Sequence, residues 1–259
     1  MKEAPILTHP PILLALVQVR ISPILQMEAF IPKIQEELRS NGFPQFKKIT
    51  QGALIAAPGA PNLMQNPLFF WEFASKNERR NIVVGTESIA FTVTDYSTFE
   101  DFQEGIAVAL STIHEIVTIP LVTRVGFRFV NVITAAPGKS LGAYVRPELL
   151  GLPLTDRAVQ RIGYGSQLVC RSGSGFFILR SSCAERGPVL SPDVQLFSLK
   201  TDRPSVMDEE FCVLDLDHYI ERNADFNTKE VLKDLSGLHD LLENTFLTAV
   251  TKEALEEWK

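Results

Sequence analysis

The residues best suited to binding a metal ion are Asp215, Asp217 and His218, which lie within four positions of one another. Carboxylate oxygens and an imidazole nitrogen can share a divalent cation, as a metal-dependent hydrolase would require. In a β-strand, side chains 215 and 217 point to one face and 218 to the other, so all three converge only where the strand has already ended. The alternative is a structural role, in which aspartates at a strand end accept hydrogen bonds from turn amides.

Two histidines, His114 and His239, lie on or beside the apolar side of two expected helices. If the chain contains an internal repeat, they occupy equivalent places and could face each other to bind a ligand or a metal. The alternative is that each is a hydrogen-bonded core histidine. No serine or cysteine nucleophile with a local signature accompanies them, so we predict no catalytic residues and rank an enzyme last among the function classes.

Two arginines, Arg124 and Arg128, share one face of an expected strand because side chains alternate along it. Buried arginines need acidic partners or an anionic ligand, so these two are the candidates for sensing a small ligand or a nucleic acid. Residues 138–140 (GKS) are reminiscent of a phosphate-binding loop, but Ile133 stands where that loop needs its first glycine. We therefore predict no cofactor.

The elements that position these residues form an α+β protein. Apolar alternation and turn signals predict strands, and apolar positions at helical spacing predict helices. Pro120 separates two passes of a similar pattern, which we expect to be β-α-β-β-(β)-α halves over residues 1–119 and 120–259 in one compact unit. The expected strands are 11–21, 46–57, 68–75, 81–84, 88–94, 122–133, 161–171, 176–183 and 211–216.

Helices are predicted over residues 27–41, after a cap at Ser97 or Thr98, and after a cap at Thr228, with a shorter helical piece over 141–150. A strand-to-helix passage containing Tyr96 has a counterpart containing Tyr219 in the second half, which favours a true repeat; ordinary strand-cap-helix patterning is the alternative. Two such halves with antiparallel sheets would have the duplicated topology of TATA-binding-protein-like folds.

The composition of the chain indicates which compartment and which partners to expect. Three cysteines, Cys170, Cys183 and Cys212, are odd in number and widely spaced, so we expect neither a disulfide framework nor a zinc site. No leader peptide or membrane-spanning run is recognisable, and we expect a cytoplasmic protein with no membrane partner. Residues 208–259 hold 14 acidic and 5 basic residues, which disfavours nucleic acid at the C-terminal elements but leaves it as a lesser option elsewhere.

The chain resembles a family of sporadically distributed, functionally uncharacterised prokaryotic proteins of about 260 residues. The resemblance rests on Pro11-Ile12 through Val19-Arg20-Ile21, on 124–131 (RVGFRFVN), on 214–219 (LDLDHY), and on Leu238-His239 followed by Phe246 and Trp258. Family members usually carry a basic residue after the Asn131 position, where this chain has Val132. The resemblance supplies no catalytic residues.

Patchy distribution implies horizontal transfer, as in antiviral defence and toxin-antitoxin systems. On that resemblance, the leading expectation is a non-enzymatic recognition protein that binds a protein partner through its sheet face or its acidic C-terminal helices. The alternatives are a small-ligand or nucleic-acid sensor at Arg124 and Arg128, and a metal-dependent hydrolase at Asp215 and Asp217.

Overall fold

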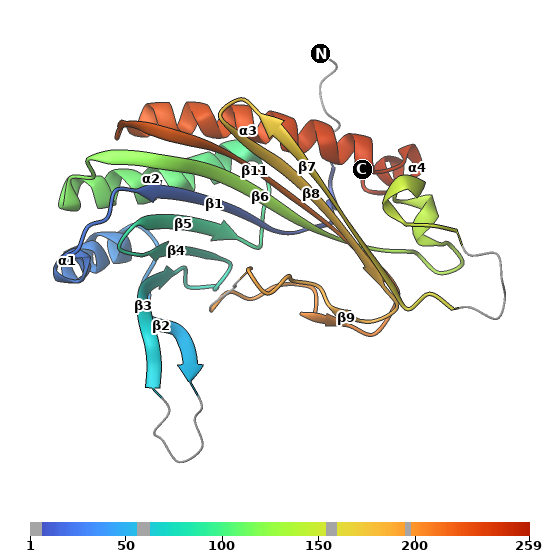
Figure 1. Ribbon diagram of the computed structural model, residues 1–259, viewed down its shortest axis with the longest axis horizontal. Coiled ribbons are helices and arrows are strands. Elements are labelled where there is room, and N and C mark those ends of the chain that lie inside the picture. The colour runs from blue at the N-terminus through green and yellow to red at the C-terminus, as the bar shows by residue number, and fades with distance from the viewer. Residues whose placement is uncertain (1–6, 56–62, 154–159, 195–197) are drawn as a thin grey trace.

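The computed structural model describes residues 7–55, 63–153, 160–194 and 198–259. They form a mixed α+β fold around one antiparallel sheet of nine strands in the order β2-β3-β4-β5-β1-β6-β11-β8-β7 (Figure 1). The α+β class and the antiparallel sheet are therefore as predicted. No helix in these ranges is long and apolar enough to cross a membrane.

The first part of the chain follows the predicted order closely. Strand β1 leads into helix α1, and the next four strands form an antiparallel meander before helix α2. The bounds are β1 Ile12–Ile21, α1 Met27–Ser40, β2 Gln45–Ile55, β3 Leu63–Ala74, β4 Arg80–Val84, β5 Ser88–Val93 and α2 Phe99–Val117. The Thr98 side chain caps α2 by accepting a hydrogen bond from the Asp101 amide, as predicted.

The second part contains the longest strands and the longest helix. The bounds are β6 Leu121–Thr134, β7 Gly163–Ser172, β8 Gly175–Ala184, β9 Gly187–Pro188, β10 Val206–Met207, β11 Phe211–Asp225, α3 Thr228–Ala249 and α4 Lys252–Glu257. The expected helical piece at 141–150 is two short 3₁₀ turns, η1 Leu141–Ala143 and η2 Pro147–Leu149. The cap of α3 is Asn227 and not Thr228, because the Asn227 side chain accepts from the amides of residues 229 and 230.

Strand β11 corrects a second prediction. It continues nine residues beyond the expected end at Leu216, so Asp215, Asp217 and His218 lie inside the strand. Its second half alternates between exposed and half-buried residues and lacks the apolar run that marks a buried strand. Pairing with β6, which extends to Asp225, holds this polar half in the sheet.

The disulfide part of the cysteine prediction is also wrong, because one disulfide is present. Cys183 on β8 and Cys212 on β11 are direct cross-strand partners and form a disulfide, while Cys170 is exposed and unpaired. The 29 residues that separate Cys183 and Cys212 hide this proximity in the sequence. Only the strand register brings the two sulfur atoms together.

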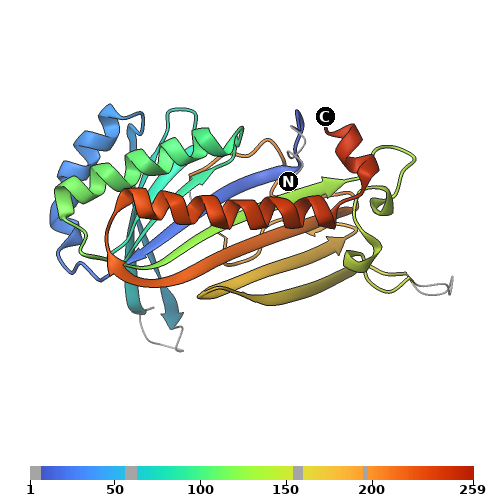
Figure 2. The same cartoon turned by 90° about the horizontal axis from the view of Figure 1, so that it is seen from above.

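The two faces of the sheet are covered differently. Helices α1, α2 and α3 lie over one face, where the alternate β6 residues Val125, Phe127 and Phe129 join the main core (Figure 2). We call the other face the helix-free face. The β6 residues that alternate with those core residues, among them Arg124 and Arg128, point to it. Strand β6 is buried on both faces along most of its length.

Residues 185–194 and 198–210, which we call the crossing segment, run over part of the helix-free face. They contain the small β9–β10 pair, which lies on the side of the sheet away from α3 (Figure 1). A second apolar cluster joins this segment to the sheet, and its members include Val189, Met207, Leu14, Val130 and Val213. Beyond this segment, Arg20 on β1 and Glu221 on β11 are exposed on the helix-free face, on either side of Arg124.

Candidate functional site

Arg128 forms the most extensive charged cluster on the helix-free face. Its Nε lies 2.7 Å from Asp215 Oδ1 and its Nη2 lies 2.5 Å from Asp215 Oδ2, which is a bidentate pair. Its Nη1 donates to Asp193 at 2.6 Å and its Nη2 to Ser191 at 3.0 Å, both on the crossing segment. Arg180 adds a contact of 3.3 Å to Asp215 Oδ2. Arg128 thus has acidic partners from within the chain, and it fastens the crossing segment to the sheet.

The charged groups of this cluster stabilise one another's charged forms. Burial alone would lower the pKa of Arg128, but the hydrogen bonds that it donates to Asp215 and Asp193 outweigh burial and raise that pKa. The Arg128 guanidinium in turn lowers the pKa of Asp193 to about 2. Both groups are therefore charged at neutral pH, and the predicted ligand-binding role of Arg128 would require a ligand to displace Asp193 or Asp215.

Arg124 differs from Arg128 although both lie on the same face. Its guanidinium carbon lies 4.0 Å from the centre of the Tyr219 ring, and its Nη1 donates to Gln18 at 3.2 Å. Within the described ranges it makes no ion pair with a carboxylate. Burial lowers the pKa of Arg124, and the charge of Asp217 opposes that effect. Arg124 is thus a half-buried cation stacked on an aromatic ring.

The three residues of the predicted metal site are divided by the sheet. Asp215 pairs with Arg128 and Arg180, and burial raises the pKa of Asp217 on the same face. His218 points to the helix side, where its Nε2 lies 3.0 Å from Ser172 Oγ and its Nδ1 lies 3.3 Å from the Leu238 carbonyl oxygen. Among the residues described, no three His, Cys, Asp or Glu side chains are grouped to hold a metal ion. Among the hydrogen bonds of the described residues, neither aspartate accepts one from a turn amide.

His114 and His239 occupy separate environments. The His114 ring stacks on Phe226 at 4.5 Å, and its buried Nδ1 has no hydrogen-bond partner in the described structure. The His239 ring stacks on Phe99 at 4.1 Å, at the opposite end of α2 from His114. The two histidines therefore do not face each other. The expected tyrosine counterparts also differ, because Tyr96 lies in the turn before α2 whereas Tyr219 lies within β11.

His239 lines a pocket of about 500 Å³ between α3, the start of α2 and the ends of β1 and β6. Its Nε2 lies 3.5 Å from the Tyr96 hydroxyl. Burial lowers the pKa of His239, which the carboxylate of Glu243 partly opposes, and burial raises the pKa of Tyr96. Both groups are consequently neutral at neutral pH. Sequence reasoning selected His239 but not the pocket around it.

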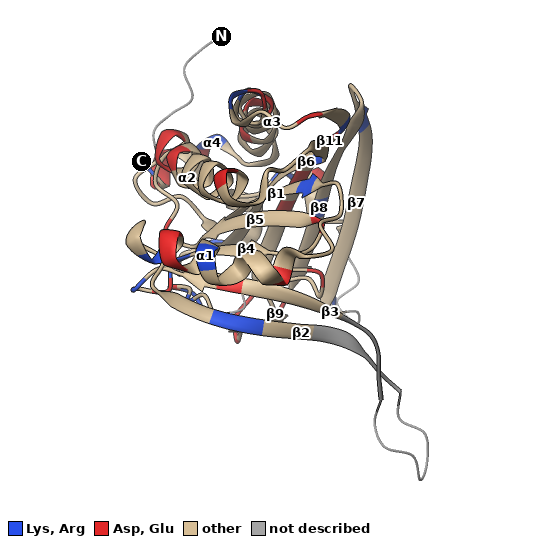
Figure 3. Ribbon diagram, turned by 90° about the vertical axis from the view of Figure 1, so that its left-hand side faces the viewer, with Lys and Arg blue, Asp and Glu red and all other residues tan. Residues whose placement is uncertain are grey.

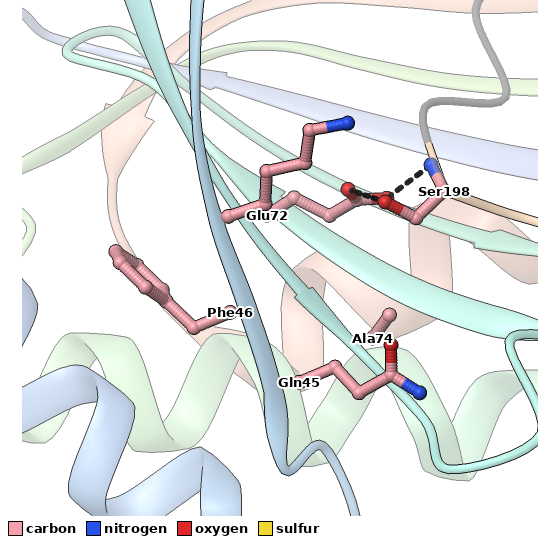
Figure 4. Close-up of a pocket in the computed structure, with 6 residues that line it drawn as sticks. Gln45, Phe46, Glu72, Ala74 and Ser198 are labelled. Atoms are coloured by element: carbon pink, nitrogen blue, oxygen red, sulfur yellow. Dashed lines mark hydrogen bonds between the residues drawn. The ribbon is translucent and has the colours of Figure 1, made fainter.

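A smaller pocket of about 180 Å³ lies at the other end of the sheet, between β2, β3 and the crossing segment (Figure 4). Its polar centre is Glu72, a carboxylate only 1% exposed. Glu72 accepts hydrogen bonds from Asn81 Nδ2 at 2.7 Å, the Ser198 amide at 3.0 Å and the Ser198 hydroxyl at 2.7 Å. Glu72 is thus a second attachment point of the crossing segment.

The strand expected at residues 161–171 is β7, but its place at the edge of the sheet was not predicted. It ends the sheet order and pairs with β8 alone, and Figure 3 shows it at the margin of the sheet. Seven of its ten residues are exposed. Apolar side chains are among them: Leu168 is 52% exposed and Val169 is 51% exposed, and Ile162 just before the strand is 76% exposed. Strands at sheet edges are usually shielded by charges, prolines or covering elements.

The backbone direction of β7 follows from its turn. Gly173 has φ of +57° and precedes Ser174 in a two-residue connection, which is typical of a type II′ hairpin. In such a hairpin the closing pair, Ser172 and Gly175, exchanges both hydrogen bonds. The N–H and C=O groups of Arg171, Val169 and Gln167 therefore point away from β8, toward the outer edge.

In comparisons with known proteins, no protein-family model matches the chain, and no curated protein matches it.

Proposed function

We propose that this chain is a non-enzymatic recognition protein that binds a protein partner by pairing an extended segment of the partner with the edge strand β7. The observation that carries the proposal is the exposure of β7 on both faces and along its outer edge. Adding a strand to a sheet edge uses backbone hydrogen bonds for affinity and alternate side chains for specificity.

The two ends of the sheet differ in a way that supports this choice. Strand β2, at the other end, carries Lys47 and Lys48, and lysines on an edge strand oppose pairing with another chain. Strand β7 carries only one charged residue, Arg171, and residues 160–171 contain two arginines and no acidic residue. A neutral or acidic partner segment therefore complements this edge better than a second copy of the same basic edge does.

The charged groups inside the fold support recognition over catalysis. Arg128 and Asp215 bind each other and the crossing segment, and His218 is held by Ser172 and Leu238. Groups engaged in this way position the sheet and its hairpin. A catalytic set would need an acid, a base or a nucleophile directed at a shared reacting atom.

The arrangement of strands supports a duplicated origin, which we also propose. Strands β1 and β6 pair at the centre, β5 and β11 flank them, and α2 and α3 follow those flanking strands. This order is what two β-α-β(n)-α halves related by a twofold axis would give, as in TATA-binding-protein-like folds. A role in prokaryotic antiviral defence or a toxin-antitoxin pair is part of the proposal and rests on the sequence resemblance alone.

Replacing Val169 with proline tests the proposal. The Val169 N–H points outward, so proline removes an edge donor while leaving the bonds to β8 intact, and edge positions tolerate it. We expect the partner to bind about tenfold to a hundredfold more weakly, because one hydrogen bond is lost and its acceptor is left unpaired. Native mass spectrometry of the protein isolated from its own host measures the fraction that carries the partner.

The control is Val169→Thr, which keeps the backbone donor and the β-branched shape. Partner binding that is lost in Val169→Pro and kept in Val169→Thr supports pairing through the edge. Equal partner occupancy in the wild type and Val169→Pro would rule out strand addition at this position.

A second candidate function is a sensor of a nucleic acid or another anionic ligand at Arg124. The favouring observation is the Arg124–Tyr219 stack, which has a cation and an aromatic face but no carboxylate partner among the described residues. Such a pair can bind a phosphate and a base together. For this function, Arg124→Glu should remove a bound 260 nm absorbance from the isolated protein, whereas Arg222→Glu, whose arginine pairs with Asp234, should leave it unchanged.

A further inference from the structure

The pocket beside His239 has the size and lining of a small-molecule site. Its volume of about 500 Å³ lies within the range of ordinary ligand pockets. Its walls come from the N-terminal segment, β1, the turn before α2, β6 and α3, so residues far apart in sequence converge on it. It lies on the helix side of the sheet, away from the β7 edge.

Aromatic side chains form much of the apolar wall. Phe99, Phe129, Phe246 and Tyr96 all line the pocket. The Tyr96 ring meets Phe129 edge-on with centroids 5.1 Å apart, and Phe99 stacks on His239. Aromatic faces carry partial negative charge, and they attract ammonium groups as well as apolar ones.

The charged groups of the pocket all have one sign. Glu100, Asp240 and Glu243 line it, and no lysine or arginine is among the residues that line it. In the described part of the chain none of these three carboxylates is paired with lysine or arginine. The positive end of α2 also opens here, but Glu100 and Asp101 in its first turn and the Thr98 cap offset its partial charge. The pocket is therefore suited to a cation and opposes an anion.

Asn131 provides a separate indication of a ligand. It is 2% exposed and lines the pocket. Its Nδ2 donates to the Leu214 carbonyl oxygen at 3.1 Å, whereas its Oδ1 accepts no hydrogen bond from the described residues. This oxygen is not among the fully buried unpaired atoms of the described structure, so it is reached from the pocket and is available to a donor on a bound molecule.

We propose that this pocket binds a small organic cation, with an ammonium group near Glu100, Glu243 and the Asn131 amide oxygen and an apolar body against the aromatic wall. The carboxylates supply the counter-charge, and the aromatic rings add cation–π attraction. The site is independent of the β7 edge, and its test has a different readout from partner binding.

The probe is phenethylammonium, compared with the anion hydrocinnamate, which has the same phenethyl body, and with neutral phenethyl alcohol in calorimetric titrations of the full chain. We expect phenethylammonium to bind, the alcohol to bind at least about fivefold more weakly, and the anion not to bind, because the pocket is negative. Glu243→Gln should weaken phenethylammonium binding by about fivefold. The control is Glu104→Gln, which removes the same charge from an exposed position on α2 outside the pocket. It should leave phenethylammonium binding unchanged.

Nuclear magnetic resonance locates the site in the same titration. Chemical-shift changes concentrated at Tyr96, Asn131 and His239 are the expected result. Equal binding of the three probes, absence of phenethylammonium binding at millimolar concentration, or an equal loss in Glu243→Gln and Glu104→Gln would each overturn the proposal.

Discussion

Replacing Arg128 with alanine is expected to lower the free energy of unfolding by about 3–5 kcal/mol, because it removes the bidentate partner of the buried Asp215 carboxylate and leaves it only the longer contact with Arg180. The side chains of Arg128 and Asp215 are 9% and 6% exposed, so water cannot replace the lost partner. Asp193 and Ser191 lose their contact as well, which detaches one end of the crossing segment. Urea denaturation followed by circular dichroism measures the change.

The matched control replaces both members of the pair, as Arg128→Met with Asp215→Leu. Removing both charges avoids an uncompensated ion, so this double variant should be substantially more stable than Arg128→Ala. Arg180 remains one-third exposed and keeps its contact with Gln167. A loss below about 1 kcal/mol in Arg128→Ala would place the pair among ion pairs of little energetic weight, and the crossing segment would need another anchor.

Replacing Gly175 with alanine is expected to destabilise the fold by about 3 kcal/mol or more, at the upper end of what overpacking costs. A methyl group there would lie 1.8 Å from the Tyr219 carbonyl oxygen and 2.7 Å from the Ile220 Cα, both backbone atoms that cannot rotate away. Strands β8 and β11 would have to separate beside the turn of the β7–β8 hairpin. The same variant should therefore also weaken partner binding at β7.

Gly237→Ala is the matched control, because Gly237 lies exposed in α3 with no atom within 4 Å of an added methyl group. It should stabilise the protein by about 0.5–1 kcal/mol, as alanine favours a helix over glycine. Thermal denaturation distinguishes the two variants by the sign of the change. If Gly175→Ala is as stable as the wild type, the close approach of β8 and β11 is not required.

The secondary structure was largely predictable from the sequence, because apolar alternation and helical spacing report on local geometry. The strand ending at Ile21, the helix ending near Ser40 and the Thr98 cap are examples. The polar half of β11 was not predictable, because its place depends on pairing with β6 and not on its own apolar pattern.

The candidate sites depended on strand register and strand order, which a single sequence does not show. Arg128 and Asp215 are 87 residues apart and meet only through the pairing of β6 with β11. The sequence predicted a shared face for Arg124 and Arg128, and both do lie on the helix-free face. The second carboxylate partner of Arg128, Asp193, comes from the crossing segment, whose path has no periodic signal in the sequence. The exposure of β7 likewise depends on its being last in the sheet.

The most direct test of recognition through β7 is amide hydrogen exchange of the chain, with and without its natural protein partner. Strand addition predicts that the outward amides of Gln167, Val169 and Arg171 exchange at least about tenfold more slowly in the complex, because each would donate a new backbone hydrogen bond. Amides of β2 should not change. Slower exchange elsewhere with no change at these three amides would contradict the proposal and place the partner on another surface.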